Sequence, residues 1–158
     1  MDSEACTRRQ GSALKYLLDA SALLPLTTRR GKQLIIDASR GDLATTDLAI
    51  YEACNSLWKL STLLKQISLE DAVDTANMIK DLATGGLIKP IKFTKLDFSN
   101  TLKIANKEGL TFYDASYIAA AENSEAILVT EDEKLKKTAN KFVKTITYSD
   151  LERKLAQS

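Results

Sequence analysis

Ala126-Ile127-Leu128-Val129 is the strongest signal for a central strand in this chain, and Thr130-Glu131-Asp132 follows it at once. An uninterrupted apolar run of this length is typical of a strand that is buried on both faces of a parallel sheet. The segment that comes next is rich in lysine and has the pattern of a helix. The stretch therefore predicts a strand, a short turn and a helix, with Asp132 placed at the carboxyl end of the strand.

The beginning of the chain has a similar arrangement. Tyr16-Leu17-Leu18 leads to Asp19 and on to Ala22-Leu23-Leu24, an apolar run that contains one carboxylate and stops at Pro25. We predict a buried strand with Asp19 near its end. An ionised carboxylate among such neighbours is partly desolvated and needs a cation or several hydrogen-bond donors. Sites in open parallel sheets form at the carboxyl ends of strands, so Asp19 and Asp132 are expected to converge.

The remaining segments alternate between helix and strand patterns. Helices are predicted at Thr27–Arg40, Asp47–Lys65, Leu69–Ala83, from Phe98 to Gly109, at Tyr113–Glu122 and, behind a capping box at Ser149–Glu152, near the C-terminus. Strands are predicted at Leu43–Thr45, Val143–Tyr148 and Leu87–Thr94, where Pro90 indicates an edge strand. Such alternation implies a parallel α/β sheet in a single domain, 12–158, preceded by a leader at 1–11.

Histidine is absent from the 158 residues. This absence excludes Ser-His-Asp and Cys-His nucleophile systems, a histidine general base and a histidine-ligated zinc. Two cysteines, Cys6 and Cys54, are too few for a disulfide framework or a cysteine metal site. If the protein is a hydrolase, carboxylates and a hard cation must carry the chemistry.

The overall composition is that of an ordinary globular domain. Apolar residues make up 44% and charged residues 27% of the chain, and the net charge of +1 neither demands nor excludes a nucleic-acid partner. The longest apolar runs are too short to span a bilayer, and no hydrophobic signal region follows the charged start. We expect a cytoplasmic protein that does not bind membranes.

Three carboxylates besides Asp19 have structural explanations that compete with functional ones. Asp132 fits a helix N-cap. Asp114 follows Thr111 by three residues, as in a Thr-x-x-Asp cap, although its helical neighbours are apolar and place it along an apolar face. Glu52 lies opposite the apolar face of its helix, so the pattern alone favours a solvated position. Trp58 and the tyrosines are expected to pack within the fold rather than to stack on bases.

Four blocks of the sequence, taken in order, resemble those of PIN-domain nucleases. They are Tyr16-Leu17-Leu18-Asp19-Ala20-Ser21-Ala22-Leu23, Glu52-Ala53-Cys54-Asn55-Ser56-Leu57, Tyr113-Asp114-Ala115-Ser116-Tyr117-Ile118-Ala119-Ala120-Ala121 and Leu128-Val129-Thr130-Glu131-Asp132-Glu133-Lys134-Leu135. Their order and placement make the combination fairly specific, and the resemblance covers nearly all of the chain after the leader. It implies a three-layer α/β/α sandwich with a central parallel sheet.

The resemblance also implies an active site. In that family four acidic positions line one cleft and bind Mg²⁺ or Mn²⁺, and the positions that match here are Asp19, Glu52, Asp114 and Asp132. The positions that match supporting polar residues are Ser21, Asn55 and Thr130. Oxygen ligands without histidine or cysteine select these cations, which can activate water for in-line attack on phosphorus. The resemblance further implies products with 5′-phosphate and 3′-hydroxyl ends.

Partners follow from the same resemblance. The length and the Glu-x-x-Asn block are similar to those of VapC-like toxins, which implies an endoribonuclease with a separately encoded antitoxin. The alternative is a non-catalytic PIN fold that binds RNA or protein. A receiver-type signalling domain needs an adjacent acidic pair after the first strand, and a dehalogenase-like phosphatase needs Asp-x-Asp there, but Ala20-Ser21 follows Asp19. A homodimer is expected through Asp47–Lys65 and Leu69–Ala83, because their apolar surface exceeds what a small sheet covers.

Overall fold

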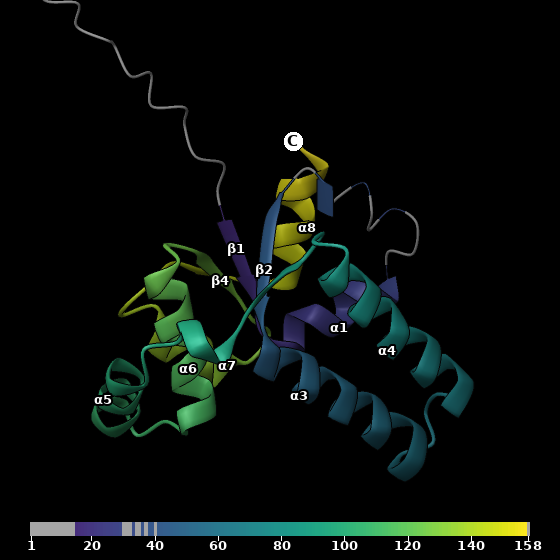
Figure 1. Cartoon of the computed structure of the whole chain (residues 1–158), viewed down its shortest axis with the longest axis horizontal. Helices are drawn as coiled ribbons and strands as arrows, with labels where there is room; N and C mark the ends of the chain where they lie inside the picture. The colour runs from purple at the N-terminus through teal and green to yellow at the C-terminus, as the bar shows by residue number, and fades with distance from the viewer. Residues whose placement is uncertain (1–14, 30–32, 34–35, 37, 40, 158) are drawn as a thin grey trace, which may run out of the picture.

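The computed structural model describes residues 15–29, 33, 36, 38–39 and 41–157. The predicted leader at 1–11, which includes Cys6, lies outside the described residues. Figure 1 shows the sheet in the middle of the molecule, with helices on both sides of it. Within the described part of the chain, no helix is both long enough and apolar enough to cross a membrane.

The described residues form a parallel sheet with the strand order β3-β2-β1-β4-β5. The strands are β1 (Lys15–Leu18), β2 (Asp42–Thr46), β3 (Lys89–Ile91), β4 (Ile127–Val129) and β5 (Thr145–Ile146). Strand β3 lies at an edge, as Pro90 predicts, and β4 is an interior strand. The strand order reverses direction between β1 and β4, which is where parallel sheets open a crevice for ligands.

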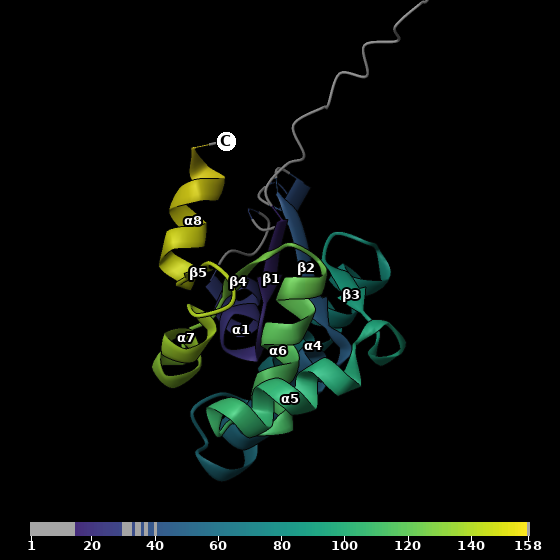
Figure 2. The ribbon, with the colours of Figure 1, turned by 90° about the vertical axis from the view of Figure 1, so that its left-hand side faces the viewer.

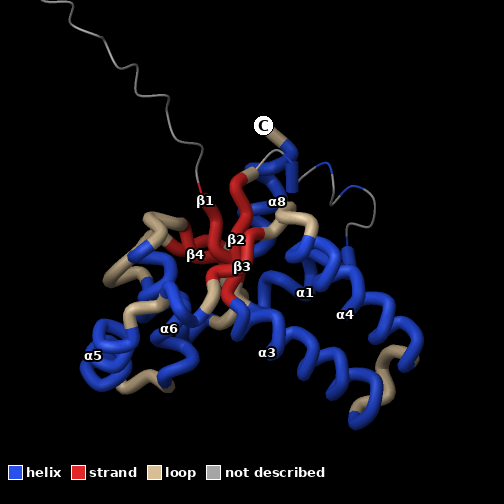
Figure 3. Tube along the Cα trace, viewed as in Figure 1, coloured by secondary structure: helices blue, strands red, loops and turns tan. Residues whose placement is uncertain are grey.

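The side chains of each strand alternate between two hydrophobic cores. Leu18 and Val129 face a core built with α1 (Ala20–Arg29), α3 (Asp47–Trp58), α4 (Leu69–Thr84) and α8 (Tyr148–Ala156). Leu17 and Leu128 face the other core, built with α5 (Phe98–Glu108), α6 (Phe112–Asn123) and α7 (Glu133–Ala139). Figures 2 and 3 show this arrangement of strands between two helical layers. The predicted three-layer α/β/α sandwich is therefore confirmed.

The segment that follows Asp19 differs from the prediction. Strand β1 ends at Leu18, so the predicted strand with Asp19 near its end is confirmed, but helix α1 starts at Ala20 and contains Pro25, whereas a helix was predicted only from Thr27. Asp19 is the cause, because its Oδ1 accepts the backbone N–H of Ala22 at 3.0 Å and its carbonyl accepts that of Leu23 at 2.9 Å. These bonds are those of a helix N-cap. A short apolar run does not distinguish a strand from the first turn of a buried helix.

Helix predictions in the middle of the chain need smaller corrections. Of the predicted helix Thr27–Arg40, α1 ends at Arg29, residues 33, 36, 38 and 39 are helical, and the remaining positions lie outside the described residues. The predicted helix Asp47–Lys65 is α3 followed by a π-helical segment, Lys59–Leu63. In α4, Leu69 and Val73 are exposed, and the face that packs carries Ala72, Ile79 and Leu82.

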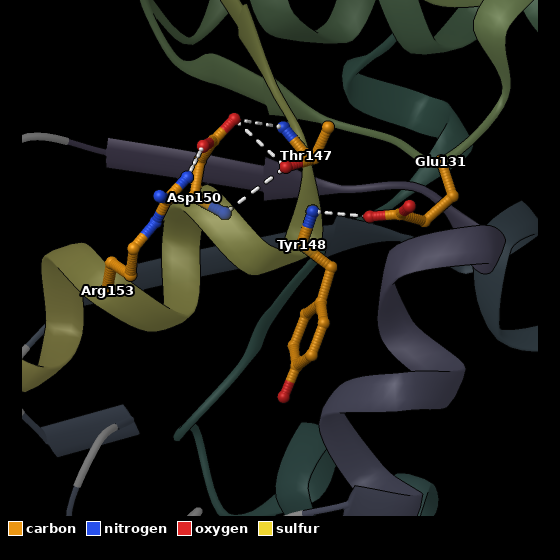
Figure 4. Close-up of polar contacts among 5 residues, drawn as sticks. All are labelled: Glu131, Thr147, Tyr148, Asp150 and Arg153. Atoms are coloured by element: carbon orange, nitrogen blue, oxygen red, sulfur yellow. Dashed lines mark hydrogen bonds and ion pairs between the residues drawn. The ribbon is translucent and has the colours of Figure 1, made fainter.

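The last strand and the last helix of the chain also have other bounds than predicted. Strand β5 is shorter than predicted, because α8 begins at Tyr148, and its capping box joins Thr147 and Asp150 rather than Ser149 and Glu152. Figure 4 shows this box together with the bond from the Tyr148 backbone N–H to Glu131 Oε1, 2.5 Å long. Glu131 precedes Asp132, so this bond ties the loop that carries Asp132 to the start of α8.

Candidate active site

The four predicted acids line one pocket of about 640 Å³ at the carboxyl end of the sheet. They arrive from four different elements: Asp19 follows β1, Asp132 follows β4, Glu52 lies on α3 and Asp114 lies in the first turn of α6. The other lining residues are Ala20, Ser21, Leu24, Leu48, Tyr51, Asn55, Ser56, Tyr113, Tyr117 and Leu135. The pocket therefore lies at the crevice where the strand order reverses.

Asp19 lies at the deep end of the site and is 3% exposed. Its Oδ1 accepts hydrogen bonds from Ser21 Oγ at 2.6 Å and from the Ala22 backbone N–H at 3.0 Å, and its Oδ2 accepts one from Thr130 Oγ1 at 2.5 Å. Burial raises the pKa of this carboxyl, the three hydrogen bonds lower it, and the charge of Asp132 raises it again, for a net increase. The protein therefore holds Asp19 in place at an energetic cost to its ionised form.

Asp132 and Asp114 both belong to helix N-termini, as their structural explanations predict. Asp132 caps α7, and its Oδ1 accepts the Leu135 backbone N–H at 2.9 Å. Thr111 caps α6, and its hydroxyl accepts the Asp114 backbone N–H at 3.1 Å. Both carboxylates nevertheless line the pocket. The cap at Asp132 uses only one of its two carboxylate oxygens, and the cap at Asp114 uses only its backbone N–H. Both residues can therefore take part in a cap and still present carboxylate oxygens to the pocket.

Glu52 is partly buried, in contrast to the solvated position that its helical pattern favours. The hydroxyl of Tyr117 donates a hydrogen bond to Glu52 Oε2 at 2.7 Å. Tyr117 is buried, and burial raises its pKa, an effect that the hydrogen bond to Glu52 and the charges of Glu52 and Asp19 increase. Its hydroxyl therefore stays protonated and remains a donor that directs Glu52 into the pocket.

The hydroxyl groups around Asp19 form one connected network. Thr130 Oγ1 donates to Asp19 and accepts the backbone N–H of Asp132 at 3.0 Å. Ser21 Oγ donates to Asp19 and accepts the backbone N–H of Glu131 at 2.8 Å. These two side chains therefore fasten the loop after β4 to the loop after β1. Asn55 lines the pocket one helical turn after Glu52, and its role stays a prediction.

The pocket concentrates negative charge. Its described lining holds four carboxylates and no lysine or arginine. No three acidic, histidine or cysteine side chains within the described residues are grouped closely enough to hold a metal ion by themselves. Mg²⁺ is commonly bound through only one or two carboxylates and keeps several waters, so such grouping is not required. Oxygen donors and uncompensated charge fit a hard divalent cation.

Sequence reasoning missed the aromatic residues of the pocket. Tyr117 was expected only to pack within the fold, yet it also orients Glu52 from a position one turn after Asp114. Tyr51 and Tyr113 line the pocket with 76% and 58% of their surfaces exposed, and Trp58 is 51% exposed. The expectation that these rings pack within the fold is wrong for all three. The available signal was the spacing of Tyr117 from Asp114, which places both on one face of a helix.

The family model for the PIN domain matches residues 16–141, a segment that contains all four acids. This chain belongs to the PIN domain family. As a PIN domain, it is similar to Exonuclease VapC9 of Pyrobaculum aerophilum, with 38% identity over 122 residues, 77% of this chain and 84% of that protein. It is also similar to Ribonuclease VapC3 of the same organism, with 34% identity over 141 residues, 85% of this chain and 99% of that protein.

A solved structure agrees with this membership. The crystal structure of PAE2754 from Pyrobaculum aerophilum has a TM-score of 0.74 and 31% sequence identity, and the comparison covers 100% of both chains. These relatives place this PIN domain among the VapC-like members of the family. The resemblance inferred from the four sequence blocks is therefore confirmed.

Proposed function

We propose that this PIN domain is a Mg²⁺- or Mn²⁺-dependent endoribonuclease and the toxin of a toxin–antitoxin pair. One observation carries the proposal: Asp19, Glu52, Asp114 and Asp132 share a pocket whose described lining has no basic side chain. Like-charged carboxylates at close range repel one another unless a cation is present. Such a pocket suits the binding of a cation and of a phosphate that the cation attracts.

The side chains of the site have separate parts in this proposal. Asp19 and Asp132 would hold the cation from the two strand ends, and the hydrogen bonds from the hydroxyls of Ser21 and Thr130 orient Asp19 and favour its ionised form. Tyr117 orients Glu52 toward the same space. A bound Mg²⁺ or Mn²⁺ supplies a Lewis acid for the phosphate and lowers the pKa of a water in the site. The chain itself contributes position and charge.

The names of the relatives support nuclease activity and leave one choice open. One is called an exonuclease and the other a ribonuclease. We assign the endonucleolytic mode because the pocket is open to solvent and lies across the end of the sheet, so that an RNA strand can pass over it without a free end. The expected products carry 5′-phosphate and 3′-hydroxyl ends.

A cleavage assay on linear and circular forms of one RNA tests the proposal. Circular RNA has no ends, so its cleavage in Mg²⁺ or Mn²⁺, but not in EDTA, identifies an endonuclease. Asp19→Asn is expected to abolish cleavage, whereas Asp74→Asn, at an exposed position of α4, serves as the matched control. Cleavage that survives both EDTA and Asp19→Asn refutes the metal-dependent mechanism. RNA binding without any cleavage supports the non-catalytic alternative.

The proposed assembly is a homodimer that also binds an antitoxin protein. The α3 and α4 region exposes a row of large apolar side chains: Trp58, Leu63, Leu64, Leu69 and Val73. Exposed apolar patches of this kind commonly mark protein interfaces. Sedimentation at micromolar concentration is expected to show a dimer that Leu69→Lys weakens. A monomer at all concentrations contradicts the dimer, and the failure of any co-expressed protein to block cleavage contradicts the toxin assignment.

A further inference from the structure

A group of aromatic rings lies beside the acidic pocket. We call Phe93, Phe98, Phe112 and Tyr113 the aromatic shelf. Together with Ile91, Leu96 and parts of α3 and α6, these rings line an apolar hollow of about 130 Å³. Phe93 is 63%, Phe98 48% and Tyr113 58% exposed. Phe98 and Phe112 pack edge to face, with ring centroids 5.4 Å apart and an interplanar angle of 86°.

The shelf is continuous with the acidic pocket. Tyr113 and Leu48 line both the hollow and the pocket. Tyr113 also precedes Asp114 directly in the chain, so a phosphodiester that reaches Asp114 has its neighbouring nucleotide within reach of the rings. Ser116, one turn further along α6, lines the hollow as well. One molecule can therefore occupy both places at once.

The edge of the shelf is held in a defined position. Phe93 begins a 3₁₀ turn, Phe93–Lys95, that follows β3. Its backbone N–H donates to Asp47 Oδ2 at 2.9 Å, and Asp47 Oδ1 accepts the Leu48 backbone N–H at 2.9 Å. This double contact fastens the turn to the start of α3, the helix that carries Glu52. The Phe93 ring is thus exposed on a backbone whose position relative to the site is set.

Charge on the shelf has the opposite sign to the substrate backbone. Lys92 and Asp47 line the hollow, and Lys95 is exposed in the same turn. Both carboxylate oxygens of Asp47 accept backbone N–H groups, which leaves the lysines as the charged groups free to contact a phosphate. The acidic pocket repels phosphates in the absence of a cation, so affinity for a polyanion has to come from its surroundings. Exposed rings next to lysines combine stacking with charge attraction, which is how proteins bind single-stranded nucleic acids.

We propose that the aromatic shelf stacks on unpaired bases next to the scissile phosphate, with Phe93 as its most exposed ring. The proposal rests on the nuclease function proposed above. In an A-form duplex the faces of the bases are covered by their neighbours, so they are not available to protein rings. An unpaired segment presents those faces to Phe93, Phe98 and Tyr113 while its phosphates pass Lys92 and the acidic pocket.

Binding measured separately from cleavage tests this inference. Fluorescence anisotropy is recorded for the full chain carrying Asp19→Asn, with one labelled oligoribonucleotide used alone or annealed to its complement. Phe93→Leu keeps an apolar side chain but removes the ring, and is expected to weaken single-strand binding about tenfold. Phe93→Trp keeps a ring and is expected to bind within about twofold of the parent. Leu102→Ala, at an exposed apolar position of α5 that lines neither the hollow nor the acidic pocket, is the control and is expected to have no effect.

The outcomes separate the shelf from the nuclease function. Equal binding of Phe93→Leu and Phe93→Trp overturns the shelf, as does equal affinity for single strand and duplex. A Phe93→Leu protein that changes only its sedimentation shows an interface between copies and also overturns it. Ring-dependent binding in a protein that cleaves no RNA supports the shelf and refutes the nuclease function. Cleavage without any effect of Phe93 refutes the shelf alone.

Discussion

Thr130→Val is expected to destabilise the protein by more than an ordinary lost hydrogen bond. Thr130 is fully buried, and its hydroxyl makes a charge-assisted bond to Asp19 Oδ2 and accepts the Asp132 backbone N–H. Valine has the same shape and makes neither bond. A hydrogen bond to a charged group is worth about 1.5–3 kcal/mol, and a partly buried N–H without an acceptor costs about 1 kcal/mol more. The unfolding free energy should therefore fall by about 2.5–4 kcal/mol.

Thr45→Val provides a matched control in the neighbouring strand. Thr45 is equally buried, and its hydroxyl donates to a neutral acceptor, the Leu18 carbonyl, at 2.8 Å. A neutral hydrogen bond contributes about 1 kcal/mol. Urea unfolding followed by circular dichroism, with EDTA present at pH 7, gives both losses. We expect Thr130→Val to cost at least twice as much as Thr45→Val.

Acid should reduce this difference. The bond from Thr130 stabilises the ionised form of Asp19, so it lowers the folded-state pKa from the value that burial alone would set. The stability that this bond contributes is therefore present when the pH is above the folded-state pKa of Asp19, and it is lost as the pH falls through that folded-state pKa. At pH 3 the carboxyl is protonated, and Thr130→Val should approach Thr45→Val. Equal costs for the two variants at both pH values would refute the charge-assisted bond.

Further predictions concern the rest of the site and one turn. Asp19→Asn should raise the melting temperature in EDTA at neutral pH. The raised folded-state pKa of Asp19 means that stability is lost as the pH rises through it, so the gain should vanish below about the ordinary value of 3.8. Mg²⁺ should raise the melting temperature of the parent protein but not of Asp19→Asn. Tyr117→Phe should lower kcat for cleavage severalfold with little change in KM, because it removes the hydrogen bond that orients Glu52. The unfolding free energy should fall by about 1 kcal/mol or less, because the Glu52 carboxylate can turn to water instead. Cleavage rates and urea unfolding, both compared with those of Glu52→Gln, check these expectations. Gly109→Ala should lower the unfolding free energy measured with urea by about 1 kcal/mol, since Gly109 ends α5 with φ 65°, a backbone conformation that is costly for alanine. An unchanged unfolding free energy would contradict this explanation.

Composition and periodicity were sufficient to predict a parallel α/β sheet and to indicate Asp19 and Asp132 as candidate acids, whereas the three layers and the choice of Glu52 followed from the resemblance to PIN-domain nucleases. The uninterrupted apolar run before Asp132 favours a strand buried on both faces, and the absence of histidine leaves carboxylates as the groups able to bind a catalytic metal. These conclusions depend on local composition and on the period of burial, which are properties of the chain itself. The order of four short blocks then identified the family.

Tertiary structure decided how those residues work together. Helical periodicity placed Glu52 in solvent, because a helical wheel describes one helix and carries no information on its neighbours, whereas the fold brings Glu52 of α3 within hydrogen-bond reach of Tyr117 on α6. The role of Asp19 as the cap of α1 was likewise hidden, since an apolar run fits a strand and a buried helix equally well. Contacts between residues more than a hundred positions apart, such as Thr130 with Asp19, arise only when parallel strands place their ends side by side.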